Sequence, residues 1–248
     1  MGAAWPAAAA PARYVALGDS YSSGLGAGSM ISSSGSCDRS SVAYPQLWAN
    51  THSPASFAFM ACSGATTGSV LSTQLSALSP DTTPVSITIG GNDVGFESVM
   101  ETCVLHSTGT CVSAITTAEG QMATQLPGQL DQVLTAIRTA APAARVVVLG
   151  YPQLYDLSRS DFCLGLSGTD RTDLNQAATQ LDAQIQAAAA RHGDVFGDVW
   201  AAFAGHEICD GFSSWLHAVN ILDISESYHP TASGQSGAYL PVFTADAG

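Results

Sequence analysis

The sequence predicts an α/β fold: a three-layer α/β/α sandwich around a central parallel sheet of five strands. Two features of the chain point to it. Short apolar runs recur along the 248 residues and are separated by longer segments, rich in alanine, with helical spacing. Most of the strong runs are continuously apolar rather than alternating, which is typical of strands that helices cover on both faces. Such alternation of strands and helices favours a parallel sheet between two helical layers.

Five apolar runs are the predicted strands. Four are strong (Tyr14–Leu17, Phe57–Ala61, Val85–Ile89 and Val146–Leu149) and one is weaker (Val195–Val199). Three segments carry helical spacing: Val70–Leu78, Glu119–Ala140 and Thr172–His192. Pro127 is expected to kink or interrupt the second helix, because proline lacks the N–H that a helix interior needs. Asp170 or Thr172 is expected to cap the third.

One domain is predicted over residues 13–248, since no internal repeat or linker-like stretch divides them. Residues 1–12 are interpreted as a residual signal segment, because Ala7–Ala12 has the small residues typical of the end of a secretory signal. No unbroken apolar run reaches about eighteen residues, so no membrane anchor is expected. These features predict a secreted, extracellular protein, and we expect a monomer.

The charge of the chain excludes some partners. Its formal net charge is −13, with 20 acidic residues against 7 arginines and no lysine. Such a surface repels nucleic acid phosphates and anionic lipid headgroups, so no nucleic acid partner is expected. A lipid substrate would have to be attracted by apolar contact.

Six cysteines stand at positions 37, 62, 103, 111, 163 and 209, without metal-site spacing. They can pair in about fifteen ways. We favour the sequential pairing (Cys37–Cys62, Cys103–Cys111 and Cys163–Cys209), which closes the shortest loops. Disulfides imply an oxidising compartment. The alternative is a cytosolic protein with six buried thiols.

Small and polar residues follow three of the predicted strands. These endings are Gly18-Asp19-Ser20, Cys62-Ser63-Gly64 and Gly90-Gly91-Asn92-Asp93. Active residues gather at the carboxyl ends of parallel strands, so the three endings predict one catalytic rim. Ser20 taken alone is equally well a helix cap, and the glycines and Asn92 are equally well turn residues.

A histidine near the other end of the chain completes the set. His229 precedes Pro230, which biases its backbone toward an extended or turn conformation, whereas the other five histidines have no motif around them. Serine is a poor nucleophile alone and a good one with a base in reach. Ser20 and His229 therefore predict a serine esterase. Residues 18–22 are not a G-x-S-x-G elbow, which argues against an α/β-hydrolase.

In order along the chain, Gly18-Asp19-Ser20, Gly64, Gly91-Asn92-Asp93 and His229-Pro230 resemble the four blocks of the SGNH (GDSL) hydrolase family. The chain from Tyr14 to about Phe243 also resembles that family's extracellular actinobacterial lipase and phospholipase A1-like branch. The resemblance implies a flavodoxin-like fold, three sequential disulfides and no cofactor. It implies Ser20 as nucleophile, His229 as base, and an oxyanion hole of the Ser20 and Gly64 main-chain N–H groups with the Asn92 side chain.

One position departs from the family pattern. Many members carry an aspartate three residues before the histidine, and this chain has Glu226 there. Some extracellular members that the chain resembles orient the histidine with a main-chain carbonyl, here that of Ser227. We favour a Ser20–His229 dyad oriented by the Ser227 carbonyl over a triad with Glu226.

Three functions remain open from the sequence. The leading one is a lipase or broad acyl esterase, with phospholipase A1 activity as an option, acting on an acyl ester or lipid. The second is a carbohydrate acetyl esterase, because related folds host both. The third is a binding module that has lost its catalytic activity. Such a module would carry substitutions at the motif positions, whereas Ser20, Gly64, Asn92 and His229 are all present here. Asp19 and Asp93 form no metal-binding pattern, so no metal is expected.

Overall fold

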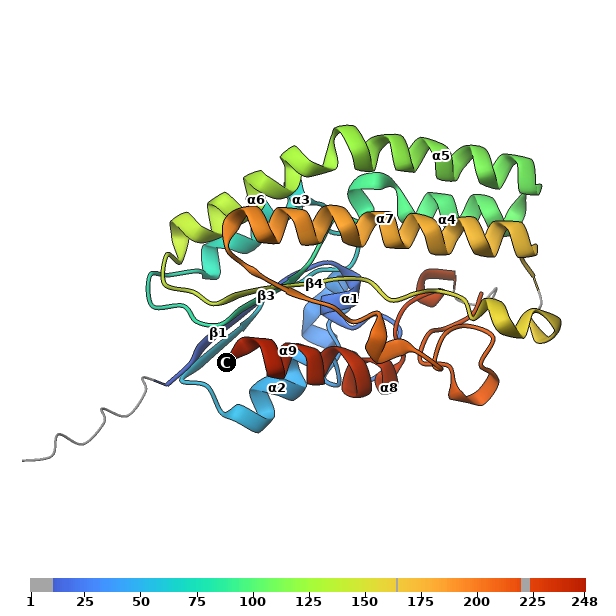
Figure 1. Ribbon diagram of the computed structural model, residues 1–248. Coiled ribbons are helices and arrows are strands. Elements are labelled where there is room, and N and C mark those ends of the chain that lie inside the picture. The colour runs from blue at the N-terminus through green and yellow to red at the C-terminus, as the bar shows by residue number, and fades with distance from the viewer. Residues whose placement is uncertain (1–10, 164, 220–223) are drawn as a thin grey trace, which may run out of the picture.

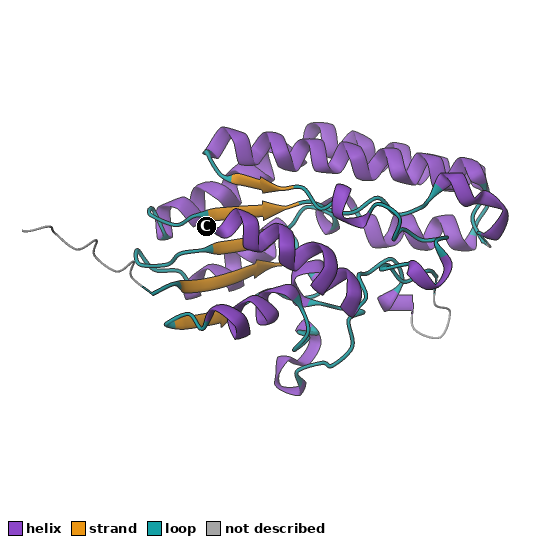
Figure 2. Cartoon of the chain, turned by 60° about the horizontal axis from the view of Figure 1, so that its bottom comes forward, coloured by secondary structure: helices purple, strands orange, loops and turns teal. Residues whose placement is uncertain are grey.

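The structure, a computed structural model, describes residues 11–163, 165–219 and 224–248. A five-stranded parallel sheet lies between two layers of helices, which confirms the predicted fold class (Figures 1 and 2). Residues 1–10, most of the predicted signal segment, lie outside the described residues.

The sheet has the strand order β2-β1-β3-β4-β5, and every neighbouring pair is parallel. This is the flavodoxin-like order. The strands are β1 (Arg13–Gly18), β2 (Ser56–Phe59), β3 (Val85–Thr88), β4 (Val146–Leu149) and β5 (Val195–Gly197). All residues of β3 and β4 are buried. The continuous apolar run of β4 predicts this, whereas in β3 the polar Ser86 and Thr88 are buried as well.

Helices cover both faces of the sheet. The α-helices are α1 (Ser20–Ser23), α2 (Tyr44–His52), α3 (Thr67–Ser69), α4 (Phe96–Leu105), α5 (Thr108–Thr124), α6 (Leu126–Ala140), α7 (Gly168–His192), α8 (Ala232–Gly234) and α9 (Leu240–Ala247). One layer holds α3, α6 and α7, with α4 and α5 beside them; α2, α8 and α9 form the other (Figure 1). Short 3₁₀ or π segments include η2 (Val70–Gln74), η3 (Leu75–Ala77), η4 (Asn92–Val94), η5 (Leu157–Phe162), η8 (Ile224–Glu226) and η9 (Gln235–Tyr239).

The helices differ from the prediction in four places. The predicted Val70–Leu78 helix is the π segment η2 followed by the 3₁₀ segment η3. The predicted Glu119–Ala140 helix is two helices, α5 and α6, and Pro127 lies in the first turn of α6, where its missing N–H costs nothing. The predicted caps of α7 were wrong: Ser167 caps it, and Asp170 completes the capping box from the third helical position. Helices α2 and α4 were not predicted.

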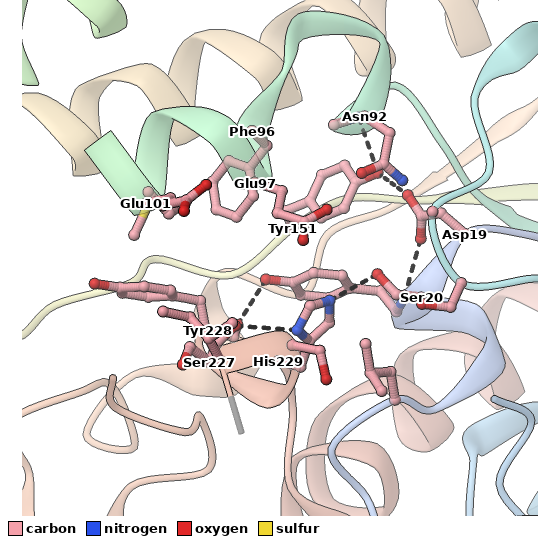
Figure 3. A pocket seen from close by; sticks show the side chains of 18 of the residues that line it. Asp19, Ser20, Asn92, Phe96, Glu97, Glu101, Tyr151, Ser227, Tyr228 and His229 are labelled. Atoms are coloured by element: carbon pink, nitrogen blue, oxygen red, sulfur yellow. Dashed lines mark hydrogen bonds between the residues drawn. The ribbon is translucent and has the colours of Figure 1, made fainter. Parts of the chain in front are cut away.

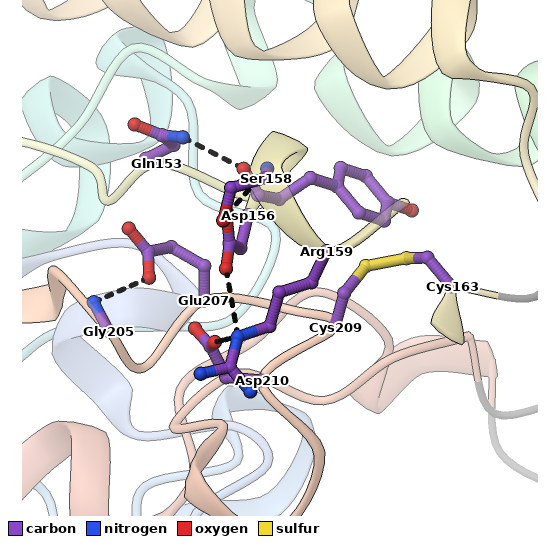
Figure 4. Close-up of polar contacts among 10 residues, drawn as sticks. Gln153, Asp156, Ser158, Arg159, Cys163, Gly205, Glu207, Cys209 and Asp210 are labelled. Carbon is purple, nitrogen blue, oxygen red and sulfur yellow. Dashed lines mark hydrogen bonds and ion pairs between the residues drawn. A yellow bond between two sulfur atoms is a disulfide. The ribbon is translucent and has the colours of Figure 1, made fainter. Parts of the chain in front are cut away.

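The six cysteines lie in three sequential pairs, Cys37–Cys62, Cys103–Cys111 and Cys163–Cys209. The last pair joins two loops at the carboxyl end of the sheet (Figure 4). Arg159 lies between the same two loops, with its Nε 3.4 Å from the Asp156 carboxylate and 3.2 Å from that of Asp210. The two loops are therefore fastened to each other covalently and by charge.

Candidate active site

The carboxyl ends of the strands surround one cavity of about 350 Å³. The cavity is lined by residues from each predicted ending, namely Ser20, Gly64 and Asn92. His229, from the far end of the chain, also lines it, and Figure 3 shows it with Ser20 and Asn92. The structure thus brings together the four residues that the sequence singled out.

A sharp turn after β1 presents Ser20. Gly18 has φ +120°, and a Cβ there would lie 2.5 Å from the Thr88 carbonyl oxygen, so only glycine fits. Asp19 caps α1 by accepting a hydrogen bond from the Tyr21 N–H at 3.0 Å. Ser20 is consequently the first residue of α1 and not its cap, which leaves its hydroxyl free for other partners.

The Asp19 carboxylate is held from two neighbouring strands. It accepts hydrogen bonds from Thr88 Oγ1 at 2.7 Å and from the Tyr151 hydroxyl, which in turn accepts the Gly91 N–H at 3.2 Å. Burial raises the pKa of Asp19 to about 6, against the lowering effect of these bonds. The sequence analysis missed Tyr151, although it follows β4 and the strand-end argument could have found it.

A chain of buried hydroxyls lies beneath this turn. Tyr14 contacts Ser86 at 2.7 Å, and the Tyr44 hydroxyl donates to the same Ser86 at 3.2 Å. Ser22 contacts the Tyr44 hydroxyl at 2.9 Å and Thr88 at 2.8 Å. Because each buried hydroxyl has a partner, the network fixes side-chain positions under the serine without leaving a polar group unpaired.

His229 lies between the serine and a main-chain carbonyl (Figure 3). Its Nε2 is 2.7 Å from Ser20 Oγ, and its Nδ1 is 3.0 Å from the Ser227 carbonyl oxygen. A carbonyl only accepts hydrogen bonds, so the neutral ring carries its proton on Nδ1. Nε2 is then the acceptor for the serine hydroxyl proton.

Glu226 contacts the histidine through its main chain: the His229 N–H donates to the Glu226 carbonyl at 3.1 Å. The Nδ1–H of His229 donates to the carbonyl of Ser227, the residue after Glu226. Burial lowers the pKa of His229 to about 4, the Ser227 carbonyl opposes this, and the neighbouring His217 adds to it. The imidazole is therefore neutral at pH values where an exposed histidine would already be protonated.

Three donors line the wall of the cavity near Ser20. Among the described residues the N–H groups of Ser20 and Gly64 have no hydrogen-bond acceptor. The Asn92 amide donates one hydrogen to the Ala65 carbonyl at 3.0 Å, which leaves its second hydrogen for a ligand. Asp93 fixes the same pair of loops by accepting from the Thr67 N–H and hydroxyl. Such preorganised donors suit a developing negative charge.

The cavity continues along α4 as a trough whose wall is mainly apolar, although Glu97 and Glu101 also line it. Phe96, Met100 and Val104 are spaced by four residues, so they share one helix face, and all three line the cavity. Val219, Ile224 and Tyr228 also line it. Leu25 also lines the cavity, whereas Val94, two residues before α4, is 2% exposed and packs in the core.

Within the described ranges, no group of His, Cys, Asp or Glu side chains is arranged to hold a metal ion. The same part of the chain has no helix that combines the length and hydropathy of a membrane span.

The chain is similar to known lipases and to a phospholipase A1. "Lipase 1" of Streptomyces coelicolor is 59% identical over 97% of this chain and 90% of its own length. The crystal structure of phospholipase A1 from Streptomyces albidoflavus superposes with a TM-score of 0.93 at 54% identity, covering 96% of this chain and 100% of that one. An extracellular lipase structure from Streptomyces rimosus gives a TM-score of 0.91 at 53% identity, over 95% and 99%.

The family signature spans most of the chain. Residues 16–236 match the GDSL-like lipase/acylhydrolase family, a range that includes Ser20, Gly64, Asn92 and His229. The chain therefore belongs to the GDSL-like lipase/acylhydrolase family, as its four sequence blocks predict.

Proposed function

We propose that this carboxylic-ester hydrolase is a secreted lipase or acyl esterase with phospholipase A1 activity, acting through Ser20 and His229. The observation that carries the proposal is the 2.7 Å contact between Ser20 Oγ and His229 Nε2 inside a cavity with an apolar trough. A positioned base next to a serine hydroxyl is the arrangement that nucleophilic ester cleavage needs.

In the proposed mechanism Ser20 Oγ attacks the ester carbonyl carbon, and His229 Nε2 takes the hydroxyl proton. The resulting oxyanion accepts hydrogen bonds from the Ser20 and Gly64 N–H groups and from the Asn92 amide. His229 then returns the proton to the leaving alcohol, and an acyl-enzyme remains on Ser20. Water, activated by the same histidine, releases the acid and restores the serine.

A dyad suffices in this mechanism. The Ser227 carbonyl holds the Nδ1 proton, which keeps Nε2 in the basic form, and its partial negative charge stabilises the imidazolium less than a carboxylate would. The Glu226 triad is the alternative. It would require the Glu226 carboxylate to replace the carbonyl at Nδ1.

The trough supports long or medium acyl chains over acetyl groups. A deacetylase needs only a small acyl pocket, whereas Phe96, Met100 and Val104 extend the apolar wall over two turns of α4. The test is hydrolysis of p-nitrophenyl esters from acetate to palmitate. We expect activity to rise toward longer chains and to vanish in Ser20→Ala, because the nucleophile is lost.

Activity confined to acetate would instead establish the carbohydrate esterase, and turnover that survives Ser20→Ala would remove the serine mechanism altogether. Phospholipase A1 activity is supported by the relative of that name. Phosphatidylcholine with different acyl chains at its two positions tests it, and release of the sn-1 acid alone is expected. Secretion is supported by the three disulfides and by the extracellular lipase. Recovery of the protein from the host's culture medium would test it.

A further inference from the structure

His217, which has no motif around it, lies beside the candidate active site. Its main-chain N–H donates to the His229 carbonyl at 3.0 Å, and its carbonyl accepts the Tyr228 N–H at 2.9 Å. An antiparallel bridge between Leu216 and Pro230 continues this pairing. The segment that carries His217 is therefore hydrogen-bonded directly to the segment that carries His229.

The ring of His217 reaches the other half of the site. Its Nε2 lies 2.7 Å from the carbonyl oxygen of Gly26, in the turn that follows α1. Since a carbonyl only accepts, Nε2 carries the hydrogen of this bond. The backbone approaches closely here: a Cβ on Gly26, whose φ is +84°, would lie 3.1 Å from both His217 Cδ2 and His229 Cβ.

We infer that His217 is a positioning residue that sets the distance between Ser20 and His229, by fastening the histidine segment to the turn after the nucleophile helix. The inference rests on the proposed function. Ser20 and His229 are 209 residues apart in the chain, and this bond is one of the links that fix their relative position. Small displacements of a base from its nucleophile cost a large part of the rate.

The test compares His217→Gln with His217→Asn. The glutamine amide stands about where Nε2 stands and keeps the donor to Gly26, whereas the asparagine amide is one methylene too short. On a soluble p-nitrophenyl ester we expect the glutamine variant to keep kcat within about threefold, and the asparagine variant to lose about tenfold or more in kcat at nearly unchanged KM. Labelling of Ser20 by a fluorophosphonate should slow in the same proportion.

A comparison of kcat with KM separates positioning from mere stability, because a displaced base slows the chemical step of the folded enzyme without weakening substrate binding. His206→Gln is the control, since His206 stacks on Trp215 in the same loop. Equal kcat in both His217 variants, or a loss in the asparagine variant that appears in KM rather than in kcat, would overturn the inference. Absence of Ser20-dependent turnover in the wild type would instead defeat the proposed function.

Discussion

The serine and the histidine of the candidate site are held in different ways. The turn before Ser20 is held by a buried side-chain amide: Gln74 accepts the Gly18 N–H at 2.8 Å and donates to the Gly18 carbonyl at 2.9 Å. The Asp19 carboxylate is bound by Thr88, the last residue of β3, and by Tyr151, which follows β4. The nucleophile therefore stands on a buried polar network assembled from several distant parts of the chain.

The orientation of His229 is set mainly by hydrogen bonds to the main chain just before it. Its ring is oriented by the carbonyl of Ser227, two residues earlier, and its N–H bonds to the carbonyl of Glu226. Between them Tyr228 has φ +67°, a conformation that non-glycine residues rarely adopt and that the Tyr21 hydroxyl supports by donating to the Tyr228 carbonyl at 2.8 Å. The contrast indicates that side-chain changes matter most on the serine side and least in the two residues, Glu226 and Ser227, whose carbonyls bind His229.

The largest effect is expected from Asn92→Ala, on the serine side. The change removes one oxyanion donor and the bond to the Ala65 carbonyl, so kcat should fall by about 10²–10³-fold with a smaller change in KM. Steady-state kinetics on a soluble ester measures it. An unchanged kcat would show that Asn92 is not a donor to the transition state.

On the histidine side, the lowered pKa of His229 predicts how the rate depends on pH. Only the neutral ring acts as base, so kcat/KM should rise with pH through a midpoint near 4, rather than near the usual histidine value of 6.5. A pH–rate profile of the wild type on a soluble ester checks this. A midpoint at the usual value would mean that burial does not govern this ring.

The smallest effect is expected from Asp182→Asn, which changes a buried carboxylate that binds the main chain of Tyr151. Asp182 accepts the Tyr151 N–H at 2.8 Å, and burial raises its pKa to about 8 from 3.8. Between these values the unfolded chain releases the proton and the folded protein keeps it, so wild-type stability falls as pH rises. The variant keeps the acceptor without titrating. It should melt a few degrees higher than the wild type at about pH 9, with little difference at about pH 4. An equal difference at both pH values would contradict this cause.

The strands and the four site residues could be predicted because their signals are local. Continuous apolar runs identify buried parallel strands, and strand ends share one edge of the sheet. Helix α4 lacked such a signal: it begins at Phe96 directly after the Gly95 turn, has no side-chain cap, and places Glu97 and Glu101 among its apolar residues.

Partners that depend on tertiary approach could not be predicted. Tyr151 and Asp19 are 132 residues apart, and His217 and Gly26 are 191 apart. No sequence pattern links these residues, because each bond forms only when the folded loops meet. The choice between Glu226 and Ser227 also depended on the local backbone path, which brings the carbonyl of Ser227 to Nδ1.

The most direct test of the account is kcat/KM of Glu226→Gln on a soluble ester. Glu119→Gln is the control, because it makes the same change of charge at a glutamate of α5 that bonds to Gln180. With the Ser227 carbonyl orienting His229, the Glu226 variant should keep its activity within about one order of magnitude. A loss on the order of 10⁴-fold, as expected when a triad carboxylate is neutralised, would show that the acid is essential and would contradict the dyad.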